Sequence, residues 1–325
     1  MRKTAVIILN YNNPTDTINC VESVRQFNTA LVRIVVVDNG STLPGCVSDI
    51  DAYLSKSYGD NYCRMSDKDD FEGGLSDVTF LVSQKNDGYA RGNNKGILLA
   101  TKDESIEYLL ILNNDVLFIE DIIPGLMQSM DSLDDCGIIG PLLFKKNCEG
   151  IDWNCARLAT PLSQWTRNNF LAPFHWLARM SAEDIYRDRL ILRDMPEPYP
   201  EIVPIELPSG SCMFVKKRFF NKIGNFDPNT FLYSEENILY RKIKDAGQRN
   251  YIDTRLRCIH LGASTISRRQ SSAIVKAGRD SQNYYIKNYL KPSALSYSLF
   301  KASEAWVRVM ESLKNIVKPN QKAEI

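Results

Sequence analysis

The stretch Ile111-Leu-Asn-Asn-Asp-Val116 joins an apolar run to a carboxylate, and the rest of the chain is organised around this junction. Residues 108–112 are all apolar, and the run is short enough to predict a buried strand rather than a helix. Asp115 follows where that strand ends, which is where open α/β sheets bind their ligands. Taken alone, Asn-Asn-Asp is consistent with a polar turn after a core strand or with a ligand for a divalent cation.

Upstream of this stretch, short apolar runs at residues 4–9, 33–37 and 79–82 predict three more buried strands. A helix capped by Thr15 or Asp16 is expected between the first two. Strand, helix and strand with short links form a βαβ unit, which implies a parallel sheet. The polar segment 44–77 interrupts the alternation, and we expect part of it to be a mobile insertion.

Downstream, the pattern predicts a helix over about 121–133 and strands at 137–144, 210–215 and 251–260. Ser234 is expected to cap a further helix whose first turn holds Glu235 and Glu236. Residues 145–207 are irregular and mix tryptophans, such as Trp165, with arginines, such as Arg167. This composition suits stacking on sugars or contact with phosphate, and an ordinary subdomain core explains the tryptophans equally well.

The segment 86–96 carries glycines at positions 88, 92 and 96 just before and within a predicted helix. This spacing is not G-x-G-x-x-G, so it argues against a nicotinamide or flavin enzyme. Glycines spaced by fours lie along one helix face, where they allow close packing on a sheet. They also leave room for a ligand beside the helix start, whose N–H groups attract phosphate, and both interpretations can hold together.

The composition of the 325-residue chain is that of a globular protein, with 44% hydrophobic and 24% charged residues. A net charge of +1 gives no electrostatic case for nucleic acid. The eight cysteines are scattered and lack zinc-like spacing, so we interpret them as free thiols in a reducing compartment. No signal peptide and no apolar run of roughly 18 residues are present, which predicts a cytoplasmic location.

The C-terminal segment 266–325 begins with basic residues and continues as an amphipathic helix. Its apolar stripe, at helical spacing, consists of Leu295, Leu299, Ala302, Trp306, Val309, Leu313 and Ile316. Such a stripe docks on its own protein or on a partner subunit, which would make a homodimer. A sharper alternative is a helix lying on the inner face of the plasma membrane, where the protein would be peripheral.

Motifs in one order along residues 4–265 give the chain a specific resemblance. It resembles the family 2 inverting glycosyltransferases of the GT-A fold, in the bacterial branch that contains rhamnosyltransferases and other polysaccharide-building enzymes. The motifs are Ile8-Leu-Asn-Tyr-Asn12, Val36-Val-Asp-Asn-Gly-Ser41, Asn86-Asp-Gly-Tyr-Ala-Arg-Gly-Asn-Asn-Lys-Gly96, Leu112-Asn-Asn-Asp115, Gly210-Ser-Cys-Met-Phe-Val215 and Phe231-Leu-Tyr-Ser-Glu-Glu236.

The resemblance implies an α/β fold of the GT-A (Rossmann-like) type, a mostly parallel sheet with flanking helices. A glycosyltransferase domain would span residues 1–265, with a nucleotide-sugar half (1–144) and an acceptor half (145–265) that includes an insertion. Residues 266–325 would form a C-terminal helical extension. In the family, the acid at Asp38 accepts a hydrogen bond from the pyrimidine N3–H, which implies a UDP- or dTDP-sugar donor. The other expected donor-binding residues are Asn10, Asn86, Gly88, Arg91 and Asn114.

A metal site is implied where the family's D-x-D motif falls on Asn113-Asn114-Asp115. Asp115 would be the main ligand, with Asn113 able to ligate only through its uncharged carbonyl. His260 matches a histidine that the family often uses as a further ligand. Imidazole suits Mn²⁺ better than Mg²⁺, so we expect Mn²⁺ or Mg²⁺ with Mn²⁺ preferred.

The catalytic acids implied by the resemblance are Glu235 and Glu236, and the second position holds the base. Sugar transfer needs a cation on the leaving diphosphate and a carboxylate for the acceptor proton, and Asp115 and Glu236 suit these roles. The expected acceptor is a saccharide or lipid-linked saccharide, in the synthesis of a cell-surface polysaccharide such as O-antigen or capsule. The alternative is a catalytically degenerate protein that binds nucleotide-sugar or acts as a scaffold, and Asn113 is its best support.

Overall fold

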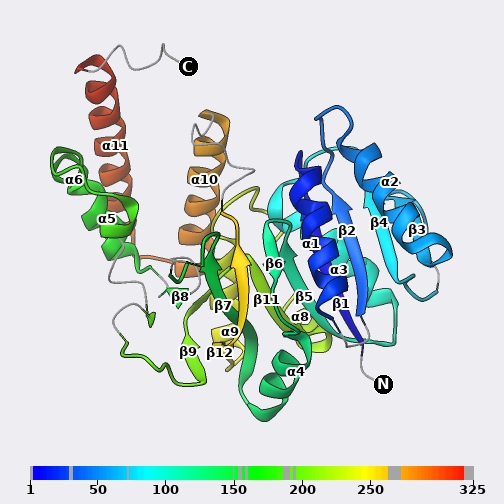
Figure 1. The fold of residues 1–325 in the computed structure, drawn as a ribbon. Coiled ribbons are helices and arrows are strands. Elements are labelled where there is room, and N and C mark those ends of the chain that lie inside the picture. Colours follow the sequence, from blue (N-terminus) through cyan, green and yellow to red (C-terminus); the bar gives the residue numbers. More distant parts are fainter. Residues whose placement is uncertain are drawn as a thin grey trace.

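The computed structural model describes residues 3–28, 32–71, 73–148, 150–152, 156–157, 160–185, 191–192, 195–262 and 272–317. Its main element is a 10-stranded sheet with the order β3-β4-β2-β1-β5-β11-β7-β12-β6, and β9 pairs with β12 off this path (Figure 1). The strands are β1 (Lys3–Asn10), β2 (Val32–Asp38), β3 (Tyr62–Ser66), β4 (Val78–Val82), β5 (Ile106–Asn113), β6 (Val116–Phe118), β7 (Cys136–Lys145), β9 (Ile202–Ile205), β11 (Cys212–Lys216) and β12 (Arg249–His260). A separate two-stranded sheet pairs β8 (Ala156–Arg157) with β10 (Leu207–Pro208).

The strands from β3 to β5 are all parallel, which confirms the sheet expected from the βαβ pattern. In this half of the sheet, Asn10 pairs with Asp38 and Leu9 pairs with Asn113. The carboxyl ends of β2, β1 and β5 therefore lie next to one another at one edge. This edge collects the polar residues that follow each strand.

Helices cover both faces of the sheet, which explains why consecutive residues in the middle of its central strands are apolar. Val6 and Ile8 of β1 lie in one core, and Ala5 and Ile7 lie in the other. The first core is covered by α1 (Pro14–Gln26), α2 (Cys46–Tyr58) and α4 (Ile123–Ser132). The second is covered by α3 (Gly88–Lys102), α8 (Lys217–Lys222) and α9 (Glu235–Asp245).

One local expectation in the first half of the chain is wrong. The cap of α1 is Asn13, whose Oδ1 accepts from the Asp16 N–H at 3.3 Å, because the helix begins earlier, at Pro14. The segment 44–77, part of which was expected to be a mobile insertion, holds α2 and the edge strand β3, and the mobility of its remainder stays a prediction. Ile50 and Leu54 of α2 are fully buried, and β3 pairs along its length with β4.

The second half of the sheet is mixed. β11 lies antiparallel between β5 and β7, and β12 runs parallel to β7. The end of β12 also pairs antiparallel with β6, with His260 opposite Val116. This pairing brings the last residue of β12 beside the turn that follows β5.

Residues 145–207 contain short helices in addition to β8, β9 and irregular backbone: α5 (Leu162–Phe170), α6 (Ala172–Leu177) and α7 (Ala182–Ile185). Trp165 is buried in a third core with Tyr285 and Phe300, so the core explanation holds for this tryptophan. Trp153, also noted in this segment, lies outside the described residues.

The C-terminal part continues with α10 (Ser272–Tyr285), a π-helix (Ile286–Leu290) and α11 (Ala294–Val317). α11 packs on α5 and α6, at the side of the molecule away from α2 and β3 (Figure 1). Phe300 and Ser303 face inward, whereas Leu295, Trp306 and Leu313 of the expected stripe are 72%, 40% and 47% exposed. Within the described part of the chain, these side chains of the stripe are therefore not buried against other elements. The basic residues Arg268, Arg269 and Lys318 lie outside the described residues.

Among the helices of the described segments, none combines the length and the apolar character that crossing a bilayer requires.

Candidate active site

Asp115 and His260 lie side by side at the edge of the sheet where β5 ends. Asp115 occupies the turn between β5 and β6, and its carbonyl accepts the Leu261 N–H at 2.8 Å. His260 Nε2 lies 3.4 Å from Asp115 Oδ1. Both side chains are nearly buried, so the pair lies within the protein surface, with little contact with bulk water.

Asp152 holds the other nitrogen of the histidine and was not anticipated from the sequence. Its carboxylate forms a short hydrogen bond with His260 Nδ1, which turns Nε2 towards Asp115. Burial of the ring opposes its charge, but the flanking carboxylates of Asp115 and Asp152 outweigh burial and raise the pKa of His260 to about 10. A carboxylate on the far nitrogen of a histidine is the usual arrangement for a metal ligand.

The donor atoms at this position fit a divalent cation. Asp115 Oδ1 is buried and has no hydrogen-bond partner, and a carboxylate oxygen facing an imidazole nitrogen suits Mn²⁺. Asn113, the third expected ligand, is nearby, with its Nδ2 3.5 Å from Ser211 Oγ. In the described part of the chain, no group of three or more His, Cys, Asp or Glu is arranged to hold a metal. A cation here would therefore take its remaining ligands from a bound diphosphate and water.

The Gly210-Ser211 turn links this pair to the candidate base. Ser211 Oγ lies 3.3 Å from His260 Nε2, and the Ser211 carbonyl accepts from the Asn113 N–H at 2.9 Å. A Cβ atom at Gly210 would lie 2.5 Å from Glu236 Oε1, so only glycine lets the carboxylate approach. Two adjacent residues thus contact His260 on one side and Glu236 on the other.

The two glutamates at the start of α9 have different surroundings. Glu235 is buried and its Oε1 has no hydrogen-bond partner, whereas Glu236 is half-buried. Burial and the charge of Glu236 raise the pKa of Glu235 to about 8. Ser234 stands at the N-cap position as expected, but at a φ of +68° its side chain makes no capping hydrogen bond.

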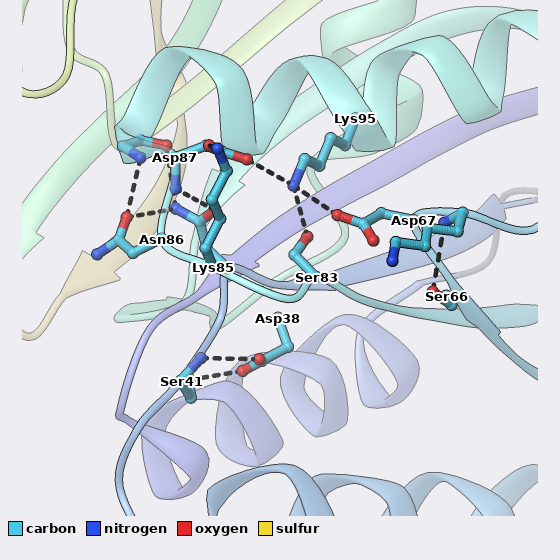
Figure 2. Close-up of polar contacts among 12 residues, drawn as sticks. Asp38, Ser41, Ser66, Asp67, Ser83, Lys85, Asn86, Asp87 and Lys95 are labelled. Atoms are coloured by element: carbon cyan, nitrogen blue, oxygen red, sulfur yellow. Dashed lines mark hydrogen bonds and ion pairs between the residues drawn. The ribbon is translucent and has the colours of Figure 1, made fainter.

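At the end of β2, Asp38 is fully buried and already holds several donors. It accepts from Asn10 Nδ2 at 2.7 Å. It also accepts from Ser41 Oγ at 2.5 Å and from the Ser41 N–H at 3.0 Å (Figure 2). Asn114 points into the same network, since its Nδ2 donates to Thr17 Oγ1 at 2.9 Å. Asn10, Asp38 and Asn114 thus form one buried polar network beneath the strand ends.

Lys95 links the ends of β3 and β4 to the start of α3, a role that was not predicted from the sequence. Its Nζ donates to Asp67 and Ser83 at 2.9 Å each and lies 2.8 Å from Asp87 Oδ2 (Figure 2). Asn86, an expected donor-binding residue, accepts from the Gly88 N–H at 2.9 Å.

The 86–96 segment packs against other parts of the chain, mainly the loop before α9. Gly88 has a φ of +82°, and a side chain there would collide with the Phe231 carbonyl. Arg91 Nε donates to the Pro228 carbonyl at 2.6 Å. Gly92 and Gly96 pack directly on side chains of β1, which confirms the close-packing interpretation of these glycines.

The chain is similar in sequence to known glycosyltransferases. Residues 5–194 match the model of Glycosyl transferase family 2. The chain is 25% identical over 232 residues to the low-salt glycan biosynthesis hexosyltransferase Agl10 of Haloferax volcanii, over 71% of this chain and 58% of that protein. It is 26% identical over 141 residues to the N-acetylglucosaminyl-diphospho-decaprenol L-rhamnosyltransferase of Mycobacterium tuberculosis, over 43% of this chain and 42% of that protein. The chain thus spans about half the length of these two relatives.

A solved structure shares the fold across nearly the whole chain. It is a crystal structure of GalNAc-T7 with UDP, GalNAc and Mn²⁺, with a TM-score of 0.55 and 16% identity, covering 94% of this chain and 55% of that one. At this identity the likeness concerns the fold, which is the GT-A fold with added C-terminal helices.

Proposed function

Because the chain belongs to glycosyl transferase family 2, we propose that it is an inverting glycosyltransferase that moves a hexosyl group from a UDP- or dTDP-sugar to a saccharide acceptor. The observation that carries this proposal is the Gly210-Ser211 turn, whose adjacent residues contact His260 and Glu236. This turn therefore brings together His260, which would help to hold the donor diphosphate, and Glu236, the proposed proton acceptor.

The pyrimidine of the donor is assigned to the end of β2, where Asp38 lies. A cavity of about 420 Å³ opens at the neighbouring ends of β3 and β4, next to Asp38 because Val82 pairs with it. The carboxylate of Asp38 accepts hydrogen bonds only, which suits the N3–H of uracil or thymine. Tighter binding of GDP-sugars than of either pyrimidine nucleotide would contradict this assignment.

The diphosphate is assigned to the position of Asp115 and His260, the two residues that would hold a divalent cation. When bound, such a cation would supply positive charge to offset the charge that develops on the leaving diphosphate. Asp152 keeps the imidazole oriented, so that Nε2 faces the ligand. Mn²⁺ is the preferred ion because the site combines one carboxylate with one imidazole.

Glu236 is proposed as the base in a single displacement. The acceptor hydroxyl oxygen attacks C1 of the donor sugar while the bond between C1 and the diphosphate oxygen breaks. The diphosphate leaves with the bonding electron pair, and the hydroxyl proton passes to the carboxylate of Glu236. Attack opposite the leaving group inverts the configuration at C1.

The acceptor is proposed to be lipid-linked, as the name of the mycobacterial relative states for that protein. The apolar side chains of α6 and α11 support a location at a membrane surface. Phe174, Leu177 and Leu295 are 61%, 74% and 72% exposed on two helices that pack together. A helix of this kind lies in the headgroup region with its apolar face buried.

The reaction is tested by incubating the full chain with Mn²⁺, a panel of nucleotide-sugars and a synthetic lipid-diphosphate monosaccharide. We expect one UDP- or dTDP-sugar to give a disaccharide whose new bond has the anomeric configuration opposite to the donor. Retention of configuration would contradict the single displacement by the acceptor hydroxyl with Glu236 as its base. Tight binding of the nucleotide-sugar with no transfer to any acceptor would favour the scaffold alternative.

The membrane surface is tested with the double variant Leu295→Ser, Trp306→Ser in sedimentation with anionic vesicles. Both side chains are exposed, so the variant is expected to fold, to remain active on a water-soluble acceptor and to bind vesicles more weakly. Unchanged vesicle binding together with loss of a dimer would assign the surface to a second copy of the chain.

A further inference from the structure

The loop of residues 226–233 directly precedes the helix that carries Glu236. It ends at Tyr233 and Ser234, which both have left-handed backbone, with φ of +70° and +68°. Because α9 begins at the next residue, the position of this 226–233 loop sets the position of Glu235 and Glu236. Whatever holds the loop therefore also holds the candidate base.

On one side, the 226–233 loop is fixed to the nucleotide half of the protein. The Tyr89 N–H donates to the Phe231 carbonyl at 2.8 Å, and Asn94 Nδ2 donates to the Phe226 carbonyl at 2.8 Å. The Tyr89 hydroxyl also donates to the Gly210 carbonyl at 2.6 Å, beside Glu236. Helix α3 thus supports one face of the loop and the turn opposite it.

On the other side, the loop is held by the C-terminal helices mainly through the buried carboxylate of Asp227, and Asn229 Nδ2 also donates to the Tyr284 hydroxyl at 3.0 Å. Asp227 Oδ2 accepts from the hydroxyls of Tyr289 at 2.5 Å and Tyr284 at 3.0 Å. Asp227 Oδ1 accepts from the Asn229 N–H at 2.9 Å, which closes the turn of the loop. Burial opposes ionisation of Asp227, but these hydrogen bonds outweigh it and lower its pKa.

The two tyrosines come from α10 and from the π-helix that follows it. π-helical turns are rare and are found at functional sites more often than elsewhere. α10 also packs against the end of the loop, because a Cβ atom at Gly278 would lie 2.9 Å from the Tyr233 ring. The C-terminal extension therefore contacts both ends of the segment that leads into α9.

We propose that Tyr284 and Tyr289 are positioning residues, which hold the 226–233 loop through Asp227 and so keep Glu236 against Gly210. The proposal rests on the assigned role of Glu236 as the base. It gives the C-terminal extension a part in the reaction that is separate from any membrane contact of α11. Loss of both hydroxyls lets the loop move, and a displacement of about 1 Å at a reacting group costs up to roughly 100-fold in rate.

The test compares the double variant Tyr284→Phe, Tyr289→Phe with the wild type and with Tyr251→Phe. Tyr251 offers a matched control, since its hydroxyl donates to Asp135 Oδ1 at 2.6 Å near the start of β12, the end opposite His260. We expect the double variant to lower kcat about 10- to 100-fold with little change in the KM for the donor. The control is expected to keep its kcat. The same double variant in a Glu236→Gln background should lower kcat no further, because residues that act through one group are not additive.

Hydrogen exchange supplies a readout that needs no activity. The amides of residues 226–236 are expected to exchange faster in the double variant than in the wild type, and to be unchanged in the control. Exchange at 226–236 equal to the wild type, or a fall in kcat that persists undiminished in the Glu236→Gln background, would overturn the proposal. If the wild type transfers no sugar, the exchange result still decides whether the tyrosines hold the loop, and only the proposed function is lost.

Discussion

The ends of β2 and β5 present two buried carboxylates in opposite states. Asp38, after β2, accepts from Asn10 and from both donors of Ser41. Asp115, after β5, has an oxygen with no hydrogen-bond partner, 3.4 Å from His260. Both side chains are less than a tenth exposed, so exposure does not separate them.

The two carboxylates differ in their hydrogen bonds. Asp38 accepts from donors within the protein, whereas Asp115 has an oxygen to which a bound ligand could be added. A buried polar atom without a partner costs free energy, and a protein keeps it where a ligand supplies the missing contact. Glu235 Oε1, at the start of α9, is another buried oxygen without a hydrogen-bond partner. We therefore expect changes near Asp115 to affect the reaction and changes at Asp38 to affect folding as well.

The largest effect on the reaction is expected at Glu236, the proposed base. Glu236→Gln keeps the shape of the side chain but cannot accept a proton, so kcat should fall by about 10² or more. Donor binding, measured by calorimetry, should stay close to normal. An active Glu236→Gln enzyme beside an inactive Glu235→Gln enzyme would exchange the roles of the two residues.

A smaller effect is expected at Asp38, and it should appear in two measurements. Asp38→Ala removes the acceptor for the pyrimidine N3–H and should weaken UDP or dTDP binding by about 1–3 kcal/mol. It also leaves Asn10 and Ser41 without their acceptor, so thermal unfolding should begin at a lower temperature. Asp115→Asn is the contrasting variant, because it weakens one contact, with His260, and leaves the Asp152 contact of that histidine in place, so it should cost less stability than Asp38→Ala. Equal losses of stability in the two variants would remove the distinction.

The last effect concerns the pH dependence of stability through Glu235. Its pKa is raised from 4.5 to about 8 by burial and by Glu236, so between these values the folded state binds a proton that the unfolded state has released. The free energy of unfolding therefore falls as the pH rises through this window, by at most about 1.4 kcal/mol per pH unit. Glu235→Gln should raise the melting temperature more at pH 8 than at pH 5. A gain that is the same at both pH values would show that Glu235 is ionised in the folded protein.

The regular half of the fold could be predicted because its strands are buried on both faces. Runs such as residues 5–9 and 34–37 are apolar throughout for that reason, and they lie within β1 and β2. The proximity of Asp115 and His260 followed from their places at strand ends, since these ends meet at one edge. The edge strand β3 was missed because it has only one neighbour and a largely polar sequence.

The supporting contacts could not be predicted, because they join segments with no shared period. Asp152 reaches His260 across 108 residues, from a short irregular segment after β7. Tyr289 reaches Asp227 across 62 residues, from a π-helix that no sequence pattern distinguishes from the end of α10. Such contacts depend on how whole elements pack, which hydrophobic periodicity does not encode.

The metal site is the central claim, and thermal unfolding with nucleotide tests it most directly. A ligand that binds only the folded state raises stability, by about 2.7 kcal/mol at 100 times its Kd. We predict that Mn²⁺ and UDP or dTDP together raise the melting temperature of the wild type more than either does alone. We further predict that EDTA, Asp115→Asn and His260→Ala each remove most of this joint gain, whereas Asp135→Asn, at a distant surface, leaves it intact. A nucleotide-dependent gain and full transferase activity that both persist in excess EDTA would contradict the account.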